Sequence, residues 1–246
     1  MRGAVMGALK LPPKEEALVA SFVKKLGKIY RDGLVSAILY GSAASGEFTG
    51  KHSNINLLIV LKDTGLKELD RSYGLVNARA FKIISPIFFT EECMKASTDT
   101  FPIEFFDMKE NYAMLYGRDV LKGLGIDTRN LRFQCEHELR SKLILIKRRY
   151  LTARNRAQAE ELLFRSFTSC LHIMRNVLRL KGKAPSYAKD MIIGEIEKEL
   201  GVDTRVFSEI LWAKNKGMRL GDREIEALLG GFVGELESIV EKVDKL

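Results

Sequence analysis

The amino-acid sequence predicts an α+β protein, in which a small domain with a mixed sheet is followed by an all-α helical bundle. Two observations support this class. Before about residue 125, short apolar runs alternate with helical stretches, as expected for helices packed on a sheet. After it, only helical periodicity remains. Hydrophobic residues make up 46% of the 246 residues, which is enough for a real core. We therefore expect two domains, at residues 1–124 and 125–246.

Four short apolar runs predict strands in the first half. Residues 34–40 and 55–61 are largely apolar, which is typical of buried strands. Residues 82–89 contain Pro86, and that places this strand at an edge or a bulge. Residues 103–108 predict a further strand.

Helical periodicity fills the segments between these runs. Asp32-Gly33 is a good stop signal for the first helix, and Thr90 is a suitable cap for a helix that begins after it. The predicted helices of the first half cover residues 15–31 and 67–80, a start after Thr90, and residues 111–121. Gly123-Leu124-Gly125 then links the two halves.

The second half contains three apolar stripes at helical spacing. The first consists of Leu139, Leu143, Ile146 and Tyr150, the second runs from Leu163 to Leu178, and the third runs from Ile225 to Val243. Shorter helices fit residues 186–200 and 204–215. Amphipathic helices joined by short links predict a bundle.

Composition narrows the class of protein. The sequence has no run of 18 apolar residues and its N-terminus lacks a secretory h-region, so we expect a cytoplasmic protein without a membrane span. Cys93, Cys135 and Cys170 are far apart and odd in number, which favours buried free thiols. The net charge of +8 permits a polyanionic ligand without requiring one.

One segment carries candidate chemistry. The strand at 34–40 leads into Gly41-Ser42, where glycine would let the backbone approach a phosphate and the serine hydroxyl can donate a hydrogen bond. Asn54 and Asn56 are two residues apart at the start of the next strand, so their side chains share one face, about 7 Å apart. Carboxylates in this arrangement can hold a pair of divalent ions.

This segment resembles the signature of the nucleotidyltransferase superfamily, in which Gly-Ser and a second glycine precede Ser-Asp-x-Asp at a strand start. The matching residues are Gly41, Ser42, Gly46 and Ser53. Asn54 and Asn56 stand at the two aspartate positions. The two-half layout is similar to that of kanamycin nucleotidyltransferase and the minimal nucleotidyltransferases, and the helical half resembles their substrate-binding or HEPN-like domains.

The resemblance implies a reaction in which an acceptor hydroxyl attacks the α-phosphorus of a nucleotide, helped by metal ions. Two asparagines in place of aspartates remove two negative charges, so we expect no bound metal. The favoured hypothesis is a catalytically impaired protein that binds a nucleoside triphosphate or a similar phosphate ligand between its domains. The expected binding residues are Gly41, Ser42, Lys51, Ser53, Asn54 and Asn56.

Two alternatives remain open. The chain is an active transferase with altered metal use, which would need Mg²⁺, or it is a toxin–antitoxin-like partner of another protein. The family also has a third carboxylate on a later strand, which acts as a general base or a metal ligand. Glu104 and Asp107 are the candidates, and only one of them can serve, because residues three apart on a strand face opposite ways. Glu104 is the candidate that we prefer and Asp107 is the alternative.

Other polar residues favour structural roles. Lys51 and His52 could hold a phosphate or be solvated loop charges. Arg165 and His172 share a helical face at a spacing that resembles the HEPN ribonuclease pattern, but His172 adjoins the apolar stripe. His137 has no metal-ligating neighbour. A homodimer and a nucleic-acid partner stay open. Nucleic acid is the less favoured partner because few aromatic residues lie among the basic clusters at 147–156 and 175–183.

Overall fold

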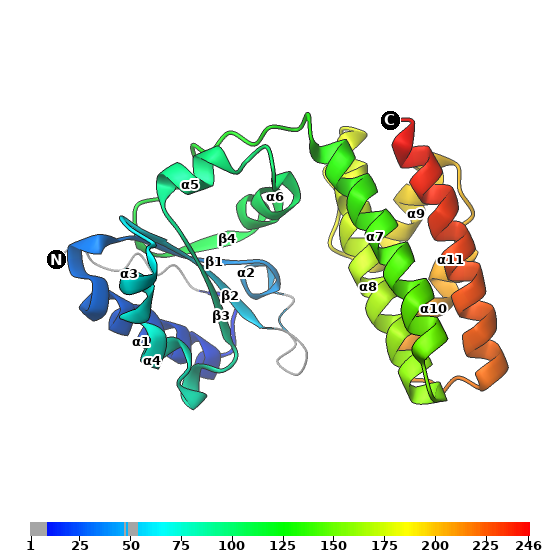
Figure 1. The fold of residues 1–246 in the computed structure, drawn as a ribbon, viewed down its shortest axis with the longest axis horizontal. Helices are drawn as coiled ribbons and strands as arrows, with labels where there is room; N and C mark the ends of the chain where they lie inside the picture. The colour runs from blue at the N-terminus through cyan, green and yellow to red at the C-terminus, as the bar shows by residue number, and fades with distance from the viewer. Residues whose placement is uncertain (1–8, 47, 49–53) are drawn as a thin grey trace. The chain divides into compact units, whose positions relative to one another are not determined.

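The computed structural model describes residues 9–46, 48 and 54–246. Contacts divide the chain into two compact units, with unit 1 ending at Ile126 and unit 2 beginning at Asp127 (Figure 1). Unit 1 contains a mixed sheet with helices on both faces, and unit 2 contains helices alone among its secondary-structure elements. The α+β class predicted from the sequence is therefore confirmed.

The sheet of unit 1 has four strands in the order β3-β2-β1-β4. Strand β1 pairs antiparallel with β2 and with β4, whereas β2 pairs parallel with β3. The strands are β1 (Leu34–Tyr40), β2 (Ile55–Leu61), β3 (Ile84–Phe89) and β4 (Tyr112–Gly117). Because β1 and β2 are the central strands, their side chains are buried on both faces of the sheet.

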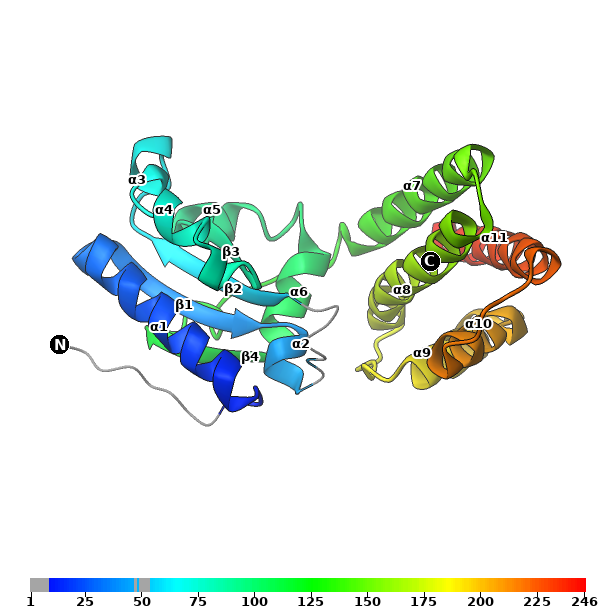
Figure 2. The ribbon, with the colours of Figure 1, turned by 90° about the horizontal axis from the view of Figure 1, so that it is seen from below.

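Helices cover both faces of this sheet, as Figures 1 and 2 show. Alternate residues of the strands, such as Leu39 and Leu57, pack with Phe22 of α1 in one core. Ile38 and Leu58 face the other way and pack with Phe105 of α6 in a second core. The helical elements of unit 1 are α1 (Pro13–Tyr30), η1 (Arg31–Gly33), α2 (Ser42–Ser45), α3 (Leu66–Asp70), α4 (Tyr73–Val76), η2 (Arg79–Phe81), α5 (Glu91–Ala96) and α6 (Pro102–Glu110).

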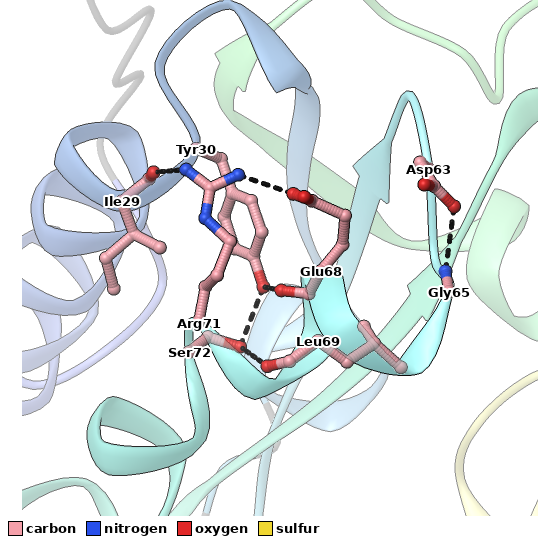
Figure 3. Close-up of polar contacts among 8 residues, drawn as sticks. All are labelled: Ile29, Tyr30, Asp63, Gly65, Glu68, Leu69, Arg71 and Ser72. Atoms are coloured by element: carbon pink, nitrogen blue, oxygen red, sulfur yellow. Dashed lines mark hydrogen bonds and ion pairs between the residues drawn. The ribbon is translucent and has the colours of Figure 1, made fainter.

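Hydrogen bonds connect α3 and the start of α4 to the end of α1 (Figure 3). The hydroxyl of Tyr30 donates to the carbonyl oxygen of Glu68 at 3.0 Å and lies 2.9 Å from Ser72 Oγ. The Ser72 hydroxyl donates to the carbonyl of Leu69 at 3.0 Å. Arg71 lies over the Tyr30 ring and binds both Glu68 and the carbonyl of Ile29.

Unit 2 is a bundle around three aromatic rings that pack edge to face or tilted. The rings of Phe167, Phe207 and Phe232 come from three different helices and lie 5.3 to 6.4 Å apart between centroids. The helices are α7 (Leu131–Thr152), α8 (Arg156–Leu180), α9 (Lys189–Leu200), α10 (Arg205–Lys216) and α11 (Asp222–Asp244). Over the described ranges, no helix is both long and apolar enough to cross a membrane.

Two predicted elements of unit 1 were wrong in type. Residues 103–108 form part of helix α6, not a strand, and β4 lies where we expected a helix at 111–121. Pro102 occupies the first turn of α6, a position that suits proline, and the buried positions Ile103 and Phe105 follow from helical packing. Strand β4 gains its backbone partners from β1, and this tertiary pairing overrides the helix propensity of its alanine, methionine and leucine.

Other predictions needed smaller corrections. The expected helix at 67–80 is divided into α3, α4 and η2. Tyr150 is 45% exposed, so it does not belong to the core stripe of α7. Cys93 is exposed, while Cys135 and Cys170 are buried as expected. The predicted cap is confirmed, because Thr90 Oγ1 accepts a hydrogen bond from the amide of Cys93 at 3.1 Å.

Candidate functional site

The turn between β1 and α2 requires glycine at position 41. Gly41 has φ 73° and ψ −149°, a combination that only glycine adopts without strain. Its amide donates to the carbonyl of Asn111 at 3.2 Å, and its carbonyl accepts from the amides of Ala44 and Ser45. The Gly41 amide is therefore already used within the fold.

Ser42 begins α2 directly after this turn. Its carbonyl accepts from the Ser45 hydroxyl at 3.2 Å and from the amide of Gly46, which ends α2 in a left-handed conformation. The first amides of a helix have no partner within the helix. Among the described residues, the Ser42 hydroxyl and the amides of Ser42 and Ala43 donate to no acceptor. These three groups can each donate a hydrogen bond to an anionic oxygen.

Asn56 lies in a row of side chains that crosses the whole sheet. It is opposite Tyr40 on β1 and Ser85 on β3, and Tyr40 is in turn opposite Tyr112 on β4. These residues share the face that α5 and α6 cover. The Asn56 amide also packs against the turn, since a Cβ at Gly41 would lie 3.4 Å from Asn56 Nδ2.

The remaining residues of the predicted segment lie beside this row or outside the described part. Asn54 is exposed immediately before β2, and strand alternation places it on the face of Asn56. Lys51, His52 and Ser53 lie outside the described residues.

The sheet provides no carboxylate to this row. The sequences of the four strands are LVSAILY, INLLIVL, ISPIFF and YAMLYG, without aspartate or glutamate. Within the described residues there is also no group of three or more histidine, cysteine, aspartate or glutamate side chains that suits a metal ion. Mg²⁺ is held mainly by carboxylates and substrate phosphates, so these residues fit a divalent ion poorly.

The two candidate acids lie on α6, not on a strand, so the premise that only one of them can face the site is wrong. Residues three apart on a helix lie near one face. Asp107 is partly buried and lies close enough to Tyr40 to raise the pKa of its phenol, although burial of Tyr40 is the larger cause. Glu104 is exposed. Of the two candidates, Asp107 is therefore the one whose charge reaches the Asn56 row.

Tyr112, at the far end of the row, is held by a second acid. Its hydroxyl donates to Asp119 Oδ2 at 2.8 Å. Burial, this hydrogen bond and the negative charge of Asp119 together raise the pKa of Tyr112 to about 12. Tyr112 is consequently a neutral hydrogen-bonding group at physiological pH.

A cavity of about 310 Å³ opens beside α2, on the side of the turn formed by Asn111. Lys10 lines it, and Lys10 Nζ lies 3.5 Å from the carbonyl of Ser45. The lining residues are Leu9, Lys10, Leu39, Ala44, Glu110, Asn111, Tyr112 and Ala113. Sequence reasoning missed Lys10, because it lies about 30 residues before the motif and no local pattern connects the two.

Histidine positions in unit 2 fit structural or surface roles. His172 is exposed on α8, and Arg165, two turns earlier, is 75% exposed and paired with Glu161 at 3.0 Å. His137 stacks on Phe133 with 6.2 Å between ring centroids. His172, which adjoins the apolar stripe in the sequence, has its side chain at the surface of α8.

The comparisons with known proteins agree with this architecture. Spectinomycin adenyltransferase AAD(9) from Enterococcus faecialis, solved with ATP and spectinomycin, matches with a TM-score of 0.60 at 14% identity, over 90% of this chain and 99% of its own. The chain has a nucleotidyltransferase fold. A nucleotidyltransferase-like protein from Exiguobacterium sibiricum 255-15 matches with a TM-score of 0.36 at 10% identity, over 91% of this chain and 74% of its own. No family model and no curated protein matches the sequence. The nucleotidyltransferase fold thus rests on structural likeness, and the identity of its ligand does not follow from that likeness.

Proposed function

We propose that unit 1 binds a nucleoside triphosphate, or a similar phosphate ligand, at the Gly41-Ser42 turn and does not carry out metal-dependent nucleotidyl transfer. The observation that carries this proposal is the neutral Asn56 row. The position that faces the turn is an amide, and its neighbours across the sheet are Ser85, Tyr40 and Tyr112.

The neutral row favours binding over catalysis. Two-metal transfer needs negative charge to hold the ions that neutralise the phosphates. An asparagine carbonyl oxygen has no net charge, and the strands of the sheet provide no acid to compensate. An amide can instead donate to a phosphate oxygen, which a carboxylate cannot.

The turn favours a phosphate ligand. The Ser42 hydroxyl and the first amides of α2 donate to no described residue, and Lys10 lies next to the end of α2. Donors of this kind stabilise anionic oxygens. The structural neighbour was solved with ATP, which supports a nucleotide as the class of ligand.

Asp107 supports the competing hypothesis of an active enzyme. Its charge reaches Tyr40, which is opposite Asn56, so this acid lies near the row, as does Asp119 beside Tyr112. One carboxylate with two amides would hold Mg²⁺ far more weakly than three carboxylates. An active enzyme would therefore need millimolar metal, and this separates the two hypotheses experimentally.

Calorimetry with ATP, in Mg²⁺ and in EDTA, tests the proposal together with an assay for released pyrophosphate. We expect similar affinity in both conditions and no pyrophosphate. Ser42→Ala should weaken binding about tenfold, because it removes a hydrogen bond to a charged oxygen. Ser45→Ala is the matched control, since that hydroxyl already donates to the Ser42 carbonyl.

Restoring the acids provides the reverse test. The double variant Asn54→Asp/Asn56→Asp should make ATP binding depend on Mg²⁺, because the added charges repel phosphate unless a metal neutralises them. Pyrophosphate release by the wild type that stops in EDTA would establish the active enzyme instead. Absence of ATP binding in both conditions would leave a protein-partner role.

A further inference from the structure

One end of the helical unit gathers positive charge from two separate turns. The α7–α8 turn carries Arg148, Arg149, Arg154 and Arg156, and the α10–α11 turn carries Lys216, Arg219 and Arg223; these seven residues are called the basic end. All seven side chains are exposed. Figure 1 draws both turns at the lower end of the bundle. The amide of Leu220 donates to Glu160 Oε1 at 3.2 Å, which joins the second turn to the start of α8.

The arginines of the α7–α8 turn have no acidic neighbour in their own segment, whereas Asp222, Glu224 and Glu226 lie among the cations of the α10–α11 turn. From Lys147 to Ala159 there is no acidic residue. Three carboxylates of these segments have partners outside the seven cations, because Glu160 accepts from Leu220, Glu161 pairs with Arg165, and Glu224 caps α11 at the amide of Gly221. Among the described residues, none of the seven cations forms a salt bridge.

This arrangement differs from that of other arginines in the chain. Arg71, Arg132 and Arg205, for example, each pair with a nearby carboxylate. Clustered cations without acidic partners repel one another, and an external polyanion relieves this repulsion. Arginine, which provides six of the seven cations, can bind phosphate with two parallel hydrogen bonds and can also stack on a base.

A small polar cavity lies on this surface beside Arg149. It is an open hollow of about 210 Å³ between the end of α7 and the start of α8 and is lined by Arg149, Thr152, Ala153, Gln158, Glu161 and Leu162. Its volume suits one small polar group, not a whole drug-sized ligand. Tyr150, which is exposed next to Arg149, offers a ring on which a base can stack.

We infer that the basic end binds the phosphate backbone of single-stranded nucleic acid. The cations supply affinity by releasing counterions from the phosphates, and Tyr150 supplies a stacking surface. Hydrogen-bonding side chains line the cavity and favour nucleic acid, while the exposed Leu151 makes an anionic membrane the alternative that the experiment must separate. This inference concerns unit 2 and does not depend on nucleotide binding by unit 1.

Fluorescence anisotropy with a labelled single-stranded RNA of about 20 nucleotides tests the inference, with salt titrated from about 50 to 200 mM. We expect binding that weakens steeply with salt. The variant Arg148→Gln/Arg149→Gln/Arg154→Gln/Arg156→Gln should bind at least about tenfold more weakly. Its slope of log affinity against log salt should be smaller by about 3, since each lost phosphate contact contributes about 0.7.

A matched control separates this surface from the overall charge. The variant Lys14→Gln/Lys24→Gln/Lys28→Gln/Lys67→Gln removes four exposed positive charges from unit 1 and should bind RNA within about twofold of the wild type. Equal losses in the two variants would overturn the inference, as would absence of RNA binding by the wild type. Preference for phosphatidylserine vesicles over RNA would overturn it in favour of a membrane surface. Calorimetry with ATP should be unchanged in the arginine variant, so failure here is distinguishable from failure of the proposed function.

Discussion

Gly41 is the residue on which the geometry of the turn depends. In alanine the same φ of 73° with ψ of −149° is strained, and the added methyl would meet Asn56 Nδ2 at 3.4 Å. We expect Gly41→Ala to lower the free energy of unfolding of unit 1 by about 1–3 kcal/mol, the usual cost of such a conformation. Urea denaturation measures this change.

Gly27→Ala is the control for this prediction. Gly27 lies inside α1, and a Cβ there would have no neighbour within 4 Å. Alanine is favoured over glycine in a helix, so this variant should be more stable by about 0.5–1 kcal/mol. If the two glycine variants had the same effect, the turn at position 41 would not need the observed conformation.

The three cysteines should differ sharply in reactivity. Cys93 is exposed, whereas burial raises the pKa of both Cys135 and Cys170 to about 12. The thiolate is the reactive form, and the buried thiols form it only well above neutral pH. At pH 8 we expect one thiol per chain to react with Ellman's reagent in the native protein and all three in denaturant. Fast reaction of the Cys93→Ser variant would contradict this assignment.

Part of the candidate site could be predicted from single residues. Gly41, Ser42, Asn54 and Asn56 lie within one short segment of the sequence, so a local pattern located them. Asp107, Lys10 and Tyr112 come close to the turn only through the tertiary fold. Sequence reasoning found Asp107 only as an alternative to Glu104, because the wrong element type gave the wrong orientation.

At the scale of elements, Tyr30 joins α1 to the pair α3 and α4. Its hydroxyl lies within hydrogen-bond distance of Glu68 and Ser72, and the Tyr30 side chain is buried. Tyr30→Phe should lower the free energy of unfolding by about 1–3 kcal/mol, because the Glu68 carbonyl and Ser72 Oγ lose a buried partner. Chemical denaturation and hydrogen exchange at residues 66–76 measure the change.

Tyr73→Phe is the matched control for Tyr30→Phe. Tyr73 begins α4 and is 67% exposed. Surface changes of this kind usually alter stability by less than about 0.5 kcal/mol. Equal effects of the two variants would show that the Tyr30 hydroxyl does not fasten α3 and α4.

Elements were predictable where burial and periodicity agree. The central strands β1 and β2 and the helices of unit 2 were found because each has a continuous apolar run or an apolar stripe. The exchange of types between α6 and β4 has a physical cause. Ile103–Met108 is a short apolar run, and its periodicity alone does not distinguish a strand from a helix. Which segment becomes the strand is determined by the tertiary pairing of β4 with β1. Gly117 fixes that pairing, since a Cβ there would lie 2.0 Å from the carbonyl oxygen of Val35.

At the scale of the whole molecule, the two units have separate cores. Phe22 packs on Phe81 in unit 1 with 5.2 Å between ring centroids, and Phe232 packs on Phe167 and Phe207 in unit 2. Contacts cluster within residues 1–126 and within residues 127–246. Because each unit buries its own aromatic residues, we expect each to unfold as its own cooperative transition.

Two core variants test this expectation by differential scanning calorimetry. Phe22→Ala and Phe232→Ala each leave a cavity at a fully buried ring and should each cost about 3–5 kcal/mol. If the units unfold separately, Phe22→Ala lowers the Tm of one transition and Phe232→Ala lowers the Tm of the other. Hydrogen exchange on the same variants assigns each transition, because protection should fall in α1 and β1 for Phe22→Ala and in α8, α10 and α11 for Phe232→Ala. A single transition that both variants lower would instead show that the cores are energetically coupled, and loss of one unit would then also disable the ligand-binding surface of the other.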